Sequence, residues 1–399
     1  MLKKNFQLLE IAEKTDANIS NRRINYYSIE GCYPIFANRA KGAYLWDIDN
    51  NKYLDFILGY GTIILGHSDP LVNTAVIKEL SNGNCISPLV NPIEYELCNL
   101  LVNTIPNSEM AFLMKTGSDA TSGCIRLARA ITNRDIIIRY GYNGWHDWST
   151  PKQNGVPDCV KSLTIINKEY NNIEALSRIF IENKDKVAAV IMMPFETELP
   201  NKNYLHQVKE LAQKNGALFI LDEMRTGFRI SNGGAQEYFN IEADLATYSK
   251  AMANGYPISA IVGKKQYLDY IKTTKMTATY FGSTPSMAAA KETIQIIKNN
   301  NVIDYITTLG NHFSNTVKQM INSYNIPAKF IGFNTMPFVE FVGENKEQIK
   351  KYFFKYCIKN GILLHPNHHW YISSSHTLED INFALMVIDN AMKGIRKVI

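Results

Sequence analysis

Short, continuous apolar runs in the middle of the chain constrain its fold most strongly. They extend from Ile136 to Ile138, Val187 to Met193, Ala217 to Leu221 and Ile258 to Val262. Runs of this length without polar alternation are typical of strands buried on both faces of a sheet. Between two of them, apolar residues recur at helical spacing from Leu205 to Ala212, and Asn215-Gly216 ends that helix. A strand–helix–strand order implies right-handed crossovers, so the sequence predicts an α/β fold with a mostly parallel sheet.

The sequence also predicts how the chain is divided. Its 399 residues suffice for two or more domains. We expect an N-terminal segment (1–55) that contributes to a small domain, a large domain (56–290) and a smaller α+β domain (291–399). The smaller domain contains strand patterns at 338–342 and 362–364 and a final helix. Thr377, followed three residues later by Asp380, predicts a capping box at the start of that helix.

Composition narrows the classes of function. The net charge of +5 is mild, and the basic residues are scattered, which disfavours nucleic-acid binding. Six cysteines without paired spacing favour a reducing compartment. No apolar run approaches the length that spans a bilayer, and polar residues interrupt the first thirteen positions, so no membrane association and a cytoplasmic location are expected.

Two polar residues come where predicted strands end. Asp222 closes the run 217–222, and Lys250 closes the run 244–250. At one edge of a parallel sheet, an amine can form a Schiff base with an aldehyde while a carboxylate keeps a ring nitrogen protonated. Taken alone, Lys250 is better interpreted as a solvated loop lysine, and Asp222 as a helix-capping acid. Together, and only with support from their surroundings, they indicate a pyridoxal phosphate enzyme.

Two further stretches carry candidate binding features. Lys115-Thr-Gly-Ser-Asp-Ala120 precedes a helical pattern, with Ser118 or Asp119 expected to cap the helix. Small residues at a helix N-terminus leave N–H groups that can hold a dianion, although an ordinary capped helix explains this motif as well. In the run 140–147, glycines between aromatic residues allow a ring to lie over a planar ligand; a surface turn is an equally good interpretation without context.

In these residues and motifs, the chain resembles the class III pyridoxal phosphate-dependent aminotransferases, and most closely their glutamate-1-semialdehyde aminomutase-like branch. The resemblance runs from about Pro34 to the final helix. The matching blocks are Arg39–Asp47, Ile64–His67, Lys115–Ala120, Asp222–Arg229, Asp244–Lys250, Thr279–Gly282 and Ser375–Asp380. It implies fold type I of the pyridoxal phosphate-dependent transferases, in which a large domain with a mostly parallel seven-stranded sheet joins a smaller α+β domain.

The resemblance also implies residue roles. Lys250 matches the Schiff-base lysine, and Asp222 matches the partner of the pyridinium nitrogen; these are the expected catalytic residues. Tyr142 matches the aromatic residue that stacks on the cofactor. Thr279 matches a threonine that reaches the phosphate of the neighbouring subunit, which implies a homodimer. The expected phosphate-binding residues are Thr116, Gly117 and Ser118.

Several positions depart from the family pattern and bear on the substrate. Asn143 stands where a histidine is usual, and Glu198 stands at an asparagine position. Arg225 replaces a glutamine or methionine, and contact with the ring hydroxyl, contact with a substrate anion and a salt bridge all remain open. Tyr60 lies at the position of a substrate-side aromatic residue. Tyr60, Arg225 and Glu198 are therefore the candidate substrate residues.

The segment 148–160 is short compared with the aminomutase lid, which retains a diamino intermediate between two transfers. A short segment favours an aminotransferase that uses a separate amino donor and carbonyl acceptor. The alternative is glutamate-1-semialdehyde 2,1-aminomutase. Short-lid relatives often serve modified-sugar or surface-glycan metabolism, which suggests that context here. The aminomutase's carboxylate-binding arginine has no clear counterpart, since Arg22 and Arg23 lie near it in uncertain register.

Two other classes of protein are less favoured. His365, His368 and His369 have spacings found in zinc sites, but Pro366 indicates a loop and no cysteine or carboxylate completes a set, so no metal is expected. A non-catalytic protein that keeps this fold would be expected to have lost Lys250 or Asp222, and both are present.

Overall fold

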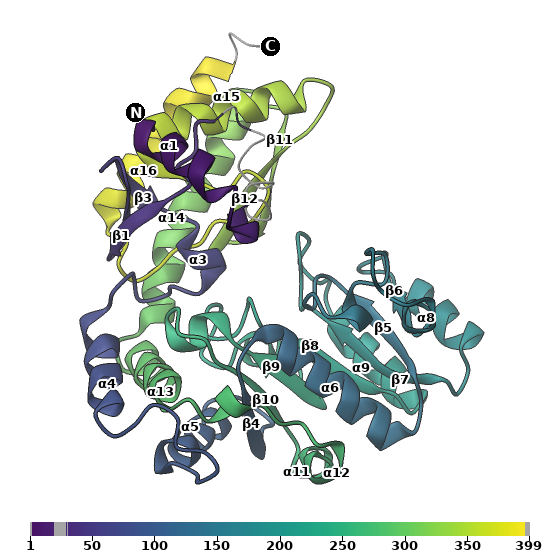
Figure 1. Ribbon diagram of the computed structural model, residues 1–399. Coiled ribbons are helices and arrows are strands. Elements are labelled where there is room, and N and C mark those ends of the chain that lie inside the picture. The colour runs from purple at the N-terminus through teal and green to yellow at the C-terminus, as the bar shows by residue number, and fades with distance from the viewer. Residues whose placement is uncertain (1, 20–28, 30, 396–399) are drawn as a thin grey trace. The chain divides into compact units, whose positions relative to one another are not determined.

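The computed structural model describes residues 2–19, 29 and 31–395 and divides the chain into two compact units (Figure 1). The terminal unit comprises residues 1–70 and 304–399, and the central unit comprises residues 71–303. The domain boundary expected at 55/56 falls inside the terminal unit, and the one expected at 290/291 falls inside the central unit. Arg22 and Arg23 lie outside the described residues. Within the described residues, no helix is long and apolar enough to cross a membrane.

The central unit is built on a seven-stranded sheet with the order β4-β10-β9-β8-β7-β5-β6. The strands are β4 (Met110–Met114), β5 (Ile136–Tyr140), β6 (Thr164–Ile166), β7 (Val187–Met192), β8 (Leu218–Asp222), β9 (Leu245–Tyr248) and β10 (Ser259–Gly263). β5 to β9 pair in parallel, and β10 is antiparallel to both β9 and β4. The predicted mostly parallel, seven-stranded sheet is confirmed.

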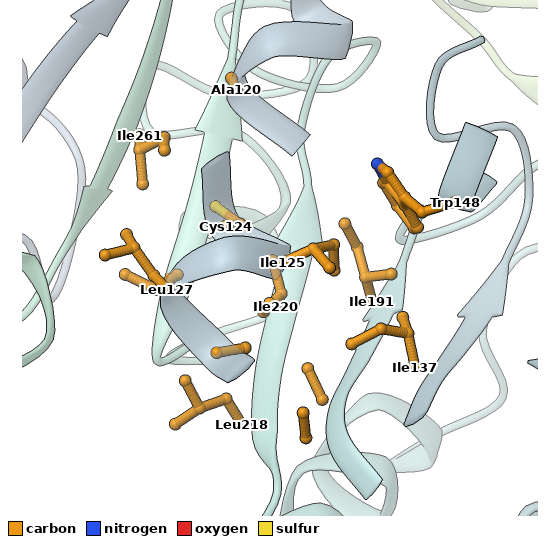
Figure 2. Close-up of a cluster of buried hydrophobic side chains, with 14 of the residues drawn as sticks. Ala120, Cys124, Ile125, Leu127, Ile137, Trp148, Ile191, Leu218, Ile220 and Ile261 are labelled. Carbon is orange, nitrogen blue, oxygen red and sulfur yellow. The ribbon is translucent and has the colours of Figure 1, made fainter. Parts of the chain in front are cut away.

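Burial explains why these runs form the centre of the sheet. Every residue of β7, β8, β9 and β10 is buried. Helix α6 (Gly117–Thr132) packs on the sheet through Cys124 and Leu127, which belong to one apolar cluster with Ile191 and Ile220 (Figure 2). Each buried apolar side chain of this size stabilises the fold by about 1.5–3 kcal/mol relative to exposure.

Further helices connect the strands of the central unit and surround its sheet. They are α4 (Pro70–Leu80), α5 (Pro92–Val102), α7 (Asp158–Lys161), α8 (Ile173–Glu182), α9 (Tyr204–Lys214), α10 (Ala235–Tyr238), α11 (Lys265–Leu268), α12 (Ile271–Thr274), α13 (Thr284–Asn299) and the 3-10 turns η2 (Asp147–Ser149), η3 (Lys250–Ala253) and η4 (Thr279–Gly282). As predicted, the helix before β8 ends at the Asn215-Gly216 pair.

The start of α6 differs from expectation. The N-cap is Thr116, whose hydroxyl accepts a hydrogen bond from the Asp119 N–H (3.2 Å), while the Asp119 carboxylate accepts one from the Thr116 N–H (2.8 Å). The expectation that Ser118 or Asp119 would be the cap is wrong. Asp119 is instead the reciprocal partner in a capping box, which leaves Ser118 inside the first helical turn.

The terminal unit combines both ends of the chain. Its four-stranded sheet has the order β1 (Ala37–Lys41), β2 (Tyr44–Asp47), β3 (Lys52–Asp55) and β13 (Ile362–Leu363), with β13 parallel to β3. Strands β11 (Ala328–Phe333) and β12 (Met336–Phe341) form an antiparallel hairpin. The helices are α1 (Lys3–Ala12), α3 (Leu58–Gly61), α14 (Val302–Ser323), α15 (Lys346–Lys359) and α16 (Leu378–Ile395).

The final helix begins as the sequence predicts. The Thr377 N–H donates to the Asp380 carboxylate (3.0 Å), and the Asp380 N–H donates to the Thr377 hydroxyl (3.1 Å). The capping box is therefore confirmed, and it satisfies two donors that the first turn of α16 cannot pair internally.

Candidate active site

Asp222 and Lys250 lie at the carboxyl ends of adjacent parallel strands. Asp222 is the last residue of β8 and is the ladder partner of Thr247 on β9. Lys250 begins the turn η3 just after β9, with a φ of 44°. A left-handed conformation costs a residue with a Cβ about 1–2 kcal/mol. Such strain concentrates at functional positions, because the surrounding fold must enforce it.

The Asp222 carboxylate is only 2% exposed and is held by two donors. The Asn143 side-chain amide donates to one oxygen (2.7 Å), and the Met224 N–H donates to the other (3.1 Å). Burial raises the pKa of Asp222, and these hydrogen bonds together with the charges of Lys250 and Arg225 offset part of that rise. The carboxylate is thus fixed in orientation at the sheet edge.

Asn143 is a site residue that the sequence reasoning noted only as a departure from the family pattern. It is buried, and its side-chain oxygen has no hydrogen-bond partner among the described residues. Its backbone is fixed as well, because the Thr121 hydroxyl donates to its carbonyl (2.8 Å). The only sequence signal for Asn143 was its position after Tyr142 in a glycine-flanked loop. Its contact with Asp222 could not be predicted from a local pattern, because the two residues are far apart in sequence.

Lys250 has an unusually low proton affinity. Desolvation contributes most, and the positive charge of Arg225 adds to it, while Asp222 opposes both; the pKa of Lys250 falls to about 8. An ordinary lysine has a pKa of about 10.4, so a much larger share of Lys250 is neutral near neutral pH. A neutral amine is the nucleophilic form that attacks an aldehyde.

Arg225 is 6% exposed and is held by main-chain oxygens. One guanidinium nitrogen donates to the carbonyls of Phe195 (2.6 Å) and Glu196 (3.0 Å). The Nε atom is buried and has no partner among the described residues. These carbonyls fix the cation without neutralising it, so its charge acts on the nearby amine. Contact with a ring hydroxyl or a substrate anion remains a prediction.

Glycines allow close packing around the N-terminus of α6. A Cβ added to Gly117 would lie 2.9 Å from the Met224 sulfur, and one added to Gly144 would lie 2.6 Å from the Ser118 hydroxyl. The Ser118 hydroxyl also accepts from the Trp145 N–H (3.3 Å). The first N–H groups of a helix have no intrahelical acceptor and attract an anion. The Thr116 side chain is occupied by the cap, and its part in phosphate binding remains a prediction.

Tyr142 belongs to the same loop, and its side chain is 62% exposed while that of Asn143 is buried. Desolvation and the charge of Asp222 raise the pKa of Tyr142. This loop therefore brings a donor to Asp222 and leaves an aromatic ring uncovered beside it. A buried carboxylate, a strained lysine, a helix N-terminus with a glycine in its first turn and an uncovered ring together fit pyridoxal phosphate.

The remaining candidate residues are Glu198, Thr279 and Tyr60. Glu198 is exposed and accepts a hydrogen bond from the Asn171 amide (2.9 Å). Thr279 is exposed at the start of η4, and its carbonyl accepts from the Cys85 thiol (3.6 Å). Tyr60 belongs to the terminal unit, where it has a φ of 59° and its ring lies 5.2 Å from that of His368.

The histidine-rich loop that contains His365, His368 and His369 follows β13 in the terminal unit. His365 and His369 are buried, and desolvation lowers the pKa of His365 to about 3, so this ring is neutral. Among the described residues, no group of three or more histidine, cysteine or acidic side chains is arranged to hold a metal ion.

Comparison with known proteins decides the family. The model of the family described as aminotransferase class-III matches residues 26–399. The chain belongs to the class III aminotransferases. It is 35% identical to 3-aminobutyryl-CoA aminotransferase of Cloacimonas acidaminovorans, over 100% of this chain and 99% of the relative. It is 32% identical to glutamate-1-semialdehyde 2,1-aminomutase of Methanosphaera stadtmanae, over 92% and 93%.

Solved structures agree with the fold. The FumI protein of Sphingopyxis sp. MTA144, in a pyridoxal phosphate form, matches with a TM-score of 0.93 and 27% identity, over 99% of this chain and 97% of that one. An omega-transaminase of Sphaerobacter thermophilus shares the fold with a TM-score of 0.90 at 21% identity, over 98% of each chain. The predicted family and fold type are confirmed, and the cofactor is pyridoxal 5′-phosphate.

Replacing Arg225 by methionine should raise the pKa of Lys250, because a buried positive charge near the amine is removed. The rate at which apoprotein develops visible absorbance with pyridoxal phosphate, followed against pH, reports this pKa. Its midpoint should move upward from about 8. At a fixed pH below the midpoint, the rate should fall about tenfold for each pH unit by which the midpoint rises. Arg178→Met, which changes an exposed arginine near Glu169, is the matched control. An unchanged midpoint in Arg225→Met would contradict the electrostatic role.

Proposed function

We propose that this protein is an intermolecular aminotransferase that moves an amino group from a small amino donor to a carbonyl acceptor. The observation that carries the proposal is the placement of Lys250 and Asp222 on neighbouring strand ends, with a strained backbone and a pKa of about 8 at the lysine. Membership of the class III aminotransferases supports the reaction class, and the donor and acceptor are the proposed part.

The residues divide the work of the reaction. Bound pyridoxal phosphate supplies an aldehyde that captures amines and a ring that accepts an electron pair. Asp222, oriented by Asn143, holds negative charge beside a protonated ring nitrogen, which favours both charged forms. Lys250 would serve as base and acid: its Nζ would take a proton from the substrate carbon and deliver it to the carbon of the former aldehyde group. The α6 N-terminus binds the phosphate, and Tyr142 covers the ring.

The short segment before β6 supports transfer between separate substrates. It consists of η2, a turn and the single-turn helix α7. A segment of this size leaves little chain to enclose an intermediate between two transfers, and an intermediate that escapes makes an aminotransferase. Full-length similarity to an aminotransferase that acts on 3-aminobutyryl-CoA supports the same conclusion.

Glutamate-1-semialdehyde 2,1-aminomutase is the second candidate, because several relatives of about 30% identity have this activity. For the aminotransferase we propose a carbonyl acceptor from modified-sugar or surface-glycan metabolism. The acyl thioester named for the relative from Cloacimonas acidaminovorans is the competing class of substrate.

We also propose that the active unit is a cytoplasmic homodimer, with Thr279 reaching the cofactor of the partner subunit. In support, Thr279 is exposed and the neighbouring Tyr280 is 67% exposed. The segment 86–90, close in sequence to the Cys85–Ser283 bridge, exposes Ile86, Leu89 and Val90. Exposed apolar side chains gathered in this way are typical of a surface that another protein covers.

Replacing Lys250 by alanine should abolish turnover and remove the visible absorbance of the pyridoxal phosphate-loaded protein, because the amine that binds the aldehyde is gone. The absorbance spectrum of the purified variant, with added cofactor, is the measurement. Lys209→Ala, which removes a partly exposed lysine near Glu242, should keep both properties. Full visible absorbance in Lys250→Ala would overturn the assignment of the lysine.

Mixed dimers test whether Thr279 acts across the interface. Lys250→Ala and Thr279→Asp each inactivate a homodimer, the second by placing a carboxylate against a phosphate. In a hybrid, one site carries both changes and the other carries neither. Random pairing then restores about a quarter of wild-type activity, since half of the dimers have one intact site. The control pair, Lys250→Ala with Asp222→Ala, should restore nothing, because both residues belong to one chain's site. No recovery in the first pair would contradict the role of Thr279.

Single-turnover screening separates the two candidate activities. Each amino donor, and then each acceptor, is added to loaded enzyme while the loss and return of visible absorbance are followed. The donors should include 3-aminobutyryl-CoA and amino sugars, and glutamate-1-semialdehyde should be tested alone. We expect donors to bleach the enzyme and a carbonyl acceptor to restore it. Efficient isomerisation of glutamate-1-semialdehyde without an acceptor would overturn the preference for an aminotransferase.

A further inference from the structure

The loop that carries Thr279 is fastened to a distant segment of the central unit. The 83–85 segment makes an antiparallel bridge between Cys85 and Ser283. The Thr284 N–H donates to the carbonyl of Asn84 (3.3 Å), and the Thr284 hydroxyl donates to the carbonyl of Gly83 (2.7 Å). The Cys85 thiol donates to the carbonyl of Thr279 itself (3.6 Å). We call these contacts the 83–85 clamp.

The clamp fixes the inner half of the loop and leaves the outer half uncovered. Thr284 is fully buried at the start of α13. Phe281 packs edge-on against Phe112 of β4, with ring centroids 6.2 Å apart. Thr279 and Tyr280, which directly precede Phe281 in η4, are exposed. The exposed threonine is therefore presented by a loop that has anchors on two sides.

The strengths of the two side-chain contacts differ. A hydroxyl at 2.7 Å from a carbonyl is a well-formed hydrogen bond, and its loss leaves a partly buried oxygen without this donor. A thiol is a weak donor, so the Cys85 contact contributes less. Thr284 should therefore be the main anchor, with Cys85 adjusting the peptide of Thr279.

We propose that Thr284 and Cys85 are positioning residues that hold Thr279 in place for the phosphate of the partner subunit's cofactor. The proposal rests on the proposed function, because it needs a phosphate at the end of Thr279. A hydrogen bond from a hydroxyl to a phosphate is strongly distance-dependent, and a fixed donor loses no loop entropy when it binds. Loosening the clamp should therefore weaken the contact with phosphate and leave the rest of the site intact.

The test compares two ligands that differ only in the phosphate. The dissociation constants of pyridoxal phosphate and of pyridoxal are measured on the apoprotein by visible absorbance. Thr284→Val and Thr279→Val should each weaken pyridoxal phosphate by about tenfold, the scale of one hydrogen bond to a charged group. The affinity for pyridoxal should stay the same. Cys85→Ala should show the same pattern to a smaller degree, and Thr284→Ser, which keeps the hydroxyl, should behave as wild type.

Thr293→Val is the matched control. Thr293 is buried in the same helix, and its hydroxyl has no hydrogen-bond partner among the described residues. Its replacement should change neither dissociation constant. If Thr284→Val does not fold, Cys85→Ala decides the matter, because Cys85 is only partly buried.

The possible outcomes are distinct. Equal weakening of both ligands by Thr284→Val would mean a general structural role and would overturn the proposal. A changed ligand ratio in Thr279→Val but not in the clamp variants would overturn it too. If Thr279→Val leaves the ratio of the two dissociation constants unchanged, Thr279 does not contact the phosphate and the proposal is overturned. Visible absorbance that depends on Lys250 would in that case still support the proposed function. If wild type binds neither ligand, the proposed function itself fails.

Discussion

The parallel pairing of β8 with β9 is the interaction on which the site depends. Because Asp222 and Thr247 are ladder partners, the carboxylate and the residue after β9 are delivered to one edge of the sheet. A shift of register by one residue would turn Asp222 to the opposite face and separate it from Asn143. Burial of both strands makes such a shift costly, so the core of the central unit fixes the geometry of the catalytic pair.

The residues around this pair are specialised for packing as much as for chemistry. Glu223, next to Asp222, is buried and accepts from the N–H groups of Ala235 and Gln236, both at 2.8 Å. Burial raises the pKa of Glu223 to about 7, and these donors offset part of the rise. A Cβ on Gly227 would lie 2.4 Å from the ring of Tyr248. Hydrogen bonds at Glu223 and close packing at Gly227 thus hold the block from Asp222 to Arg229 beside the catalytic pair.

The sequence predicted those parts of the structure that local patterns determine. The strands, the helix before β8 and the start of α16 follow from periodicity and capping residues. The predicted N-cap of α6 was wrong because Thr116, Ser118 and Asp119 are all residue types that cap helices. Only the folded turn determines which of them is the cap. Asn143 was not placed in the site, because its amide meets Asp222 across a sequence separation of 79 residues. The clamp on Thr284 spans 201 residues and has no local signal at all.

The charges at the strand ends explain why Arg225 is compatible with a catalytic lysine. The positive charge of Arg225 acts on both Asp222 and Lys250, and a positive charge at this place attracts an anionic cofactor. A protonated Lys250 could not attack the aldehyde; desolvation lowers the pKa of the lysine most, and the positive charge of Arg225 adds to that effect. Main-chain carbonyls hold Arg225 without cancelling its charge, whereas a carboxylate partner would have neutralised it. The position of the arginine thus joins attraction of the phosphate to activation of the amine.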